Sequence, residues 1–274
     1  MTVPISSLMV LAMMRLDLSS GEAVSSMIQL SVRCAVPWLY LAFAASSLHT
    51  LFPGLLSRWL LRNRKIVGLC FAATMAWQLL FILWMVGIYT QYYIENVYVL
   101  SDVVEGAVGY TFLIAMVLTS FKFGRSRLTP KQWKFLHTCG IYWLWAYAWS
   151  VYWFNLFYYE DPVAIDYVYY WSGFVAWGLR MCAWSKKRWQ KTAQPNGISQ
   201  SLFWVSGVVA VVIGLIGSSF GSAWSAQAYQ LFSTVSVMES IDRFMPYFPF
   251  VPFYPIFIIM LGAILIVKFR TETA

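Results

Sequence analysis

The sequence predicts an all-α membrane protein, a polytopic bundle of about seven transmembrane helices. Two observations indicate this class. Of the 274 residues, 60% are apolar and only 11% are charged, whereas soluble domains carry about a quarter charged residues. Apolar runs long enough to cross a bilayer also recur along the chain, and they do not alternate as the strands of a membrane barrel must.

Seven segments carry such runs, and we expect each to cross the membrane as a helix. They lie at about 28–50, 66–90, 104–121, 136–158, 163–184, 202–221 and 250–268. The stretch 5–14 is apolar but short, and no basic residue precedes it, so it does not fit a secretory signal. We expect residues 1–27 to form a short segment at or partly inside the membrane surface, with a vestigial spanning helix as the alternative.

A polar segment divides the last two predicted helices from the others. Residues 185–200 are basic and contain the turn-forming run Pro195, Asn196 and Gly197, so we expect a cytoplasmic linker there. It would join a membrane core at 28–184 to a two-helix hairpin at 201–274. The long outer loop of that hairpin, at about 222–249, suits an amphipathic helix near 224–240.

Small residues give the hairpin a surface for close helix packing. Gly214, Gly217 and Gly221 lie along one face of a predicted helix. Such a face can pack on the protein's own helices or on a partner chain, and the sequence leaves both options open.

The charged residues predict the orientation of the chain. With the seven predicted helices, 16 of the 19 Lys and Arg fall on one side of the membrane, and all acidic residues except Glu272 fall on the other. Basic loops stay in the cytoplasm, so we expect an outer N-terminus and a cytoplasmic C-terminus in a bacterial inner membrane. This asymmetry accounts for the net charge of +8 without a nucleic-acid partner. The lipid bilayer is the expected partner.

Few residues of the sequence suit catalysis, metal binding or ligand binding. The four cysteines stand singly in apolar segments, which disfavours disulfides and zinc sites. Predicted spans hold no acidic residue near their middle, which disfavours a proton relay. The outer acids suit a solvated rim better than a cation site, and the many Trp and Tyr of 136–184 suit mutual packing better than a cavity for a flat ligand. The two histidines, His49 and His137, lie at predicted cytoplasmic helix ends.

Three blocks of sequence resemble the ferric reductase-like transmembrane domain family. They are 58-RWLLRNRKIVGLCFAATMAWQ-78, 106-GAVGYTFLIAMVLTSF-121 and 133-WKFLHTCGIYWLW-145, in the family's order and spacing. The resemblance covers about residues 28–184. It implies a bundle in which histidines on two helices hold b hemes and pass electrons across the membrane.

Most heme-ligand positions of that family carry other residues here. The expected histidine of the second helix falls on Gln78, a variant position three residues earlier falls on Met75, and a second position in the fourth helix falls on Ser150. Only His137 keeps its residue. A His137–Met75 pair, or a His137–His49 pair, would be an unusual set of ligands.

Two functions follow from the resemblance. The first is a heme-free bundle, with no cofactor, that acts as a structural or assembly subunit or binds lipid-like ligands and is not an enzyme. The alternative is an oxidoreductase-type electron-transfer protein with one heme b, held by His137 and an unusual second ligand, and served by a redox partner protein. A third option, an enzyme or carrier that uses an aromatic cavity, has no substrate indicated by the sequence.

Overall fold

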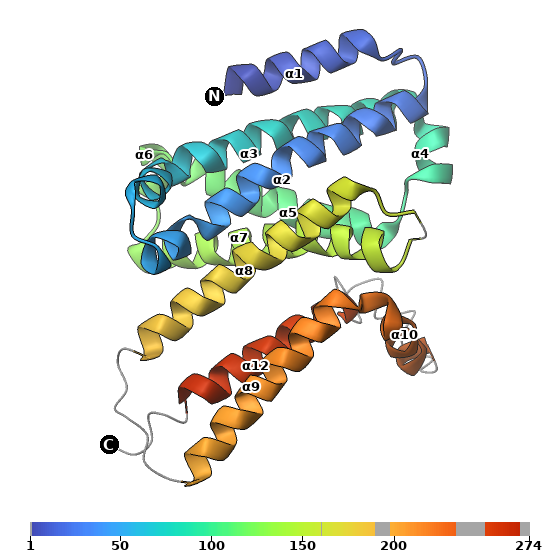
Figure 1. Cartoon of the computed structure of the whole chain (residues 1–274). Helices are drawn as coiled ribbons and strands as arrows, with labels where there is room; N and C mark the ends of the chain where they lie inside the picture. Colours follow the sequence, from blue (N-terminus) through green and yellow to red (C-terminus); the bar gives the residue numbers. More distant parts are fainter. Residues whose placement is uncertain (1, 160, 190–197, 234–249, 269–274) are drawn as a thin grey trace. The chain divides into compact units, whose positions relative to one another are not determined.

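The computed structural model describes residues 2–159, 161–189, 198–233 and 250–268, and every regular element in these ranges is a helix (Figure 1). Four helices are long and apolar enough to cross a membrane, namely α2 (Gly21–Leu51), α3 (Leu55–Ile88), α5 (Leu100–Leu118) and the part of α9 at Leu202–Ser219. By length and composition, these helices place the chain among integral membrane proteins.

The chain folds as two compact units. The first comprises Met1–Ala45 and Leu55–Ala148, and the second comprises Ser46–Gly54 and Trp149–Ala274. Helices α2 and α7 (Pro130–Phe157) each run through a boundary between the units.

The first unit also contains α1 (Thr2–Arg15), α4 (Thr90–Asn96) and α6 (Lys122–Arg125). One of its cores lies where α1 meets α2 and α3, and it consists of Met9, Val24, Met27, Phe81 and Met85, all of them at most 1% exposed. The Trp77 indole donates a hydrogen bond to the Ser6 hydroxyl at 3.2 Å, and α1 lies along α3. Unbranched methionines fill such irregular contacts readily.

Helices α5 and α7 pair closely in the same unit. Trp143 of α7 donates from Nε1 to the Glu105 carbonyl at 3.3 Å, and Gly109 of α5 faces Leu144 and Trp143. On another side of α7, the Trp145 ring stacks on Phe43 of α2 at 5.4 Å between centroids. Helix α7 therefore joins α2 and α5 in one bundle.

The second unit contains α8 (Ala164–Trp189), α9 (Ile198–Ser219), α10 (Ser225–Ser233), α12 (Tyr254–Lys268) and the short 3-10 turns η1 (Gly221–Ala223) and η2 (Val251–Phe253). Helices α9 and α12 lie side by side as a tight hairpin (Figure 1).

Glycines allow the two helices of this hairpin to approach each other closely. A Cβ built on Gly262 would lie 2.5 Å from the Gly207 carbonyl oxygen, which leaves no room for a side chain. Gly214 and Gly217 face α12 residues, and Gly221 faces Phe157. Of the two options for the glycine face, the structure packs it on the protein's own chain.

All seven predicted segments are helical, as expected, although α7, α8 and α12 do not meet the hydropathy and length expected of a span. Helix α7 carries many Trp and Tyr, α8 ends in a basic turn, and α12 is short.

The predicted surface segment contains α1, and α10 supplies the first part of the expected amphipathic helix; residues 234–249 lie outside the described residues. Both ends of the predicted linker are helical, because α8 continues to Trp189 and α9 begins at Ile198; residues 190–197 lie outside the described residues. Basic residues stabilise a C-terminal turn through the helix dipole.

Candidate functional site

His137 is hydrogen-bonded inside the first unit. Its Nε2 lies 3.0 Å from the hydroxyl oxygen of Thr119, which ends α5. That hydroxyl donates its single proton to the Ala115 carbonyl, 2.7 Å away. We therefore assign the proton of the neutral imidazole to Nε2, which donates to Thr119. This arrangement leaves only Nδ1 with a lone pair for a metal.

Trp133 lies one helical turn before His137 and organises the same end of α7. Its indole N–H donates to the Thr119 carbonyl at 3.1 Å, and its ring lies 4.2 Å from the His137 ring between centroids. The Arg125 guanidinium lies over the Trp133 ring at 4.3 Å. Thr119 thus holds both aromatic side chains at the point where α5 ends.

Gln78 and Met75 take part in a different contact. The Tyr110 hydroxyl of α5 lies 2.9 Å from the Gln78 side-chain oxygen and 3.1 Å from the Met75 carbonyl oxygen, and its one proton is shared between these two acceptors. The Gln78 side chain therefore serves as a hydrogen-bond acceptor between α3 and α5. This is an ordinary role for an amide inside a helix bundle.

The structure does not bring His137 to the level of Met75 and Gln78. His137 is tied to Thr119, whereas Met75 and Gln78 are tied to Tyr110, nine residues earlier in α5. Nine residues correspond to about 13.5 Å along a helix. Metal–nitrogen bonds are about 2 Å long, so two axial ligands lie about 4 Å apart. In this arrangement the residues do not fit a heme held by His137 and Met75.

The other two candidate positions lie in the second unit. His49 is half-buried in the last turn of α2, and Ser150 is buried in α7. Pairing of His49 with His137 stays a prediction, because the two residues belong to different units. Near His49, the Lys186 ammonium of α8 donates to the Thr50 carbonyl at 3.1 Å.

Two of the acids that were expected in a solvated outer rim are buried instead. Glu105 and Asp166 are only 8% and 3% exposed. Asp166 accepts hydrogen bonds from the Asn155 side chain at 3.1 Å and from the Val163 backbone N–H at 3.0 Å. It closes the first turn of α8, where a carboxylate also favours the helix dipole. The run 161-DPVAID-166, with a proline before the helix and an acid in its first turn, was the signal for this cap.

The aromatic residues of α7 and α8 pack on one another, as predicted. In the second unit Trp149 stacks on Tyr170 at 5.3 Å and Tyr152 contacts Tyr169 at 5.0 Å between centroids. Trp149 and Trp153 are fully buried. The Tyr170 hydroxyl donates to the Ser218 carbonyl at 2.7 Å and so ties α8 to α9.

No protein-family model, curated protein or solved structure matches this chain. Within the described ranges, no three His, Cys, Asp or Glu side chains gather as metal ligands.

Proposed function

We propose that this chain is a heme-free integral membrane subunit that retains a ferric reductase-like bundle and serves structural, assembly or lipid-binding roles. The observation that carries the proposal is the bond between His137 and Thr119. The one histidine kept at a heme position acts there as a link between α5 and α7. With the proton assigned to Nε2, only Nδ1 has a lone pair to offer a metal.

The contact of Tyr110 with Gln78 and Met75 supports the same proposal. A heme between these helices would need ligands directed at a common iron. Instead, the corresponding positions hold α3 and α5 together by hydrogen bonds. Such bonds suit a bundle whose task is to keep a fixed shape within the membrane.

The deciding experiment is an ultraviolet–visible spectrum of the full chain purified in detergent, oxidised and then reduced with dithionite. We expect no Soret band or sharp alpha band, both before and after addition of hemin. A heme band near-stoichiometric with protein, which disappears in His137→Ala, would instead establish the alternative, a single-heme b electron-transfer protein.

Thr119→Val provides a matched control for that experiment. In a heme protein, removing this hydroxyl frees Nε2 and should preserve or strengthen a His137-dependent Soret band. In the proposed structural role, Thr119→Val and His137→Ala both remove the same link, and each should lower thermal stability by a similar amount without any spectral change.

A further inference from the structure

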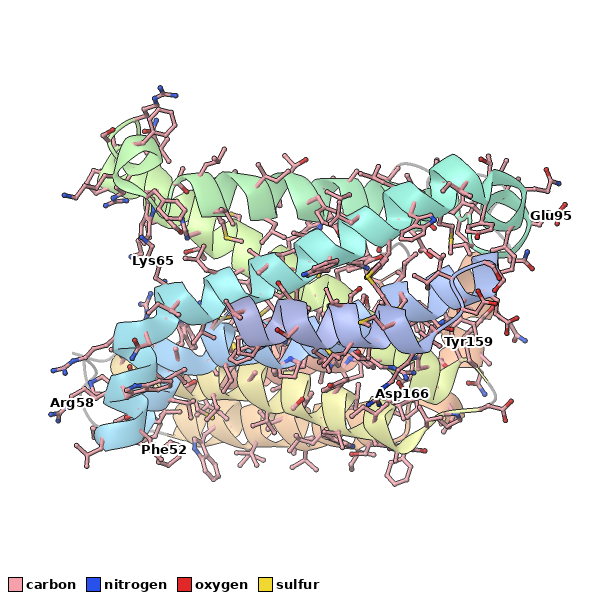
Figure 2. All side chains as sticks on the ribbon, turned by 90° about the horizontal axis from the view of Figure 1, so that it is seen from above. Phe52, Arg58, Lys65, Glu95, Tyr159 and Asp166 are labelled. Atoms are coloured by element: carbon pink, nitrogen blue, oxygen red, sulfur yellow. The ribbon has the colours of Figure 1, made fainter. Side chains whose placement is uncertain are left out.

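Most basic residues of the first unit lie at one end. Nine of its Lys and Arg lie in the first three turns of α3 or in the segment 122–134: Arg58, Arg62, Arg64, Lys65, Lys122, Arg125, Arg127, Lys131 and Lys134. Figure 2 shows Lys65 beside α6 at one end of α3 and Glu95 beyond the other end. The sequence has no Asp or Glu between residues 23 and 94 or between 106 and 159, so these segments supply no carboxylate of their own.

Aromatic rings hold several of these cations. The Lys65 ammonium lies 4.6 Å from the Phe121 ring centroid, and the Arg127 guanidinium lies 4.1 Å from that of Phe123. Both rings are themselves exposed, at 47% and 64% of their surface. Exposed rings interleaved with cations are typical of side chains at the depth of lipid headgroups.

Arg125 differs from its exposed neighbours. Its guanidinium is stacked on Trp133, and its Nη1 atom is buried without a hydrogen-bond partner among the described residues. A guanidinium stays charged at every physiological pH, and a buried donor normally has an acceptor. The position of Arg125 therefore calls for an oxygen-rich anion.

The aromatic ring beneath the Arg125 guanidinium has a hydrogen bond of its own. The Trp133–Thr119 hydrogen bond fixes the ring beneath Arg125, so the site is preorganised.

We propose that Arg125 binds the phosphate group of an anionic phospholipid. Arginine presents a planar fork of N–H donors that matches phosphate oxygens. The exposed rings of Phe121 and Phe123 would contact the lipid beside its headgroup. This site deepens the lipid-binding part of the proposed function and rests on it. Lipid binding tests this site, and hemin binding tests the heme-free role. The two are measured separately, so the failure of one proposal can be told from the failure of the other.

The test is native mass spectrometry of the full chain in detergent, titrated with phosphatidylglycerol and, in parallel, with zwitterionic phosphatidylcholine. We expect preferential retention of phosphatidylglycerol, and a loss of affinity of about tenfold in Arg125→Gln. Arg127→Gln is the matched control. It removes the same charge two residues along the chain, from a guanidinium that lies on an exposed ring. It should change the affinity less than about twofold, as surface charges do.

An equal loss in both variants, or no preference for phosphatidylglycerol in the unmodified chain, would overturn the proposal. If Arg125→Gln does not fold, Arg125→Lys is measured in its place. It keeps the charge but not the fork, and an affinity equal to that of the unmodified chain would refute recognition by the guanidinium. A final arm adds inorganic phosphate equimolar to the lipid. Displacement of phosphatidylglycerol would make free phosphate, rather than lipid, the ligand.

Discussion

At the scale of single residues, polar side chains in this bundle act mainly by joining helices. Tyr110 is the clearest case, because one hydroxyl serves both the Gln78 side chain and the Met75 carbonyl. The sequence indicated that positions 75 and 78 matter, since they align with ligand positions of the family it resembles. It gave no sign of Tyr110, whose contact depends on the rotation of α5 against α3, and residue spacing within one helix does not determine that rotation.

We expect Tyr110→Phe to lower the free energy of unfolding by about 1 kcal/mol, because the two acceptors lose their donor inside the bundle. Thermal unfolding in detergent, followed by near-ultraviolet circular dichroism, measures the change. Tyr98→Phe serves as a control, since the Tyr98 ring is 45% exposed, and it should leave the unfolding temperature unaltered. Equal stability of the two variants would show that the Tyr110 bonds contribute nothing.

At the scale of elements, the closest contact is the hairpin of α9 and α12. Helix positions could be predicted from apolar runs alone, whereas the ends of α8 and α9 could not, because the run of basic and polar residues between them is compatible with either helix or loop. The glycine spacing in α9 indicated close packing but not its partner. Gly214 and Gly217 meet Pro255 of α12, a tertiary contact that spacing within one helix does not identify.

Gly262→Ala should destabilise this hairpin by roughly 1–3 kcal/mol. The added methyl would meet the Gly207 carbonyl oxygen and the Val211 backbone nitrogen, and neither backbone atom can move without displacing α9. Gly178→Ala in α8 is the control, because nothing lies within 4 Å of its new Cβ. Thermal unfolding of both variants measures the difference, and a stable Gly262→Ala protein would mean that the helices separate at little cost.

At the scale of the whole molecule, four helices fit membrane spans by length and composition, and the charge pattern predicts their orientation. The sequence predicted more spans than these four because α7 and α8 are apolar mostly through Trp and Tyr. These residues favour the membrane interface and buried packing alike, so their presence does not by itself mark a crossing.

The predicted orientation can be tested with two single cysteines in a background in which the four native cysteines are replaced. Tyr98→Cys, between α4 and α5, should react with a membrane-impermeant maleimide in intact cells. Ser126→Cys, just after α6, should react only after the membrane is permeabilised. Both native side chains are exposed within the first unit. The reverse labelling pattern would show that the basic end faces outwards.

The placement of charge in the first unit has an electrical consequence. Nine cations lie towards one end of α3, and the unit's five acids lie in or beside the loops at the other: Asp17, Glu22, Glu95, Asp102 and Glu105. The unit is therefore a dipole along its helices. With the basic end in the cytoplasm, a membrane potential that is negative inside stabilises this orientation, because moving one charge through 100 mV is worth about 2.3 kcal/mol. Collapse of the potential should then weaken the bias during insertion, most of all in variants with fewer basic residues.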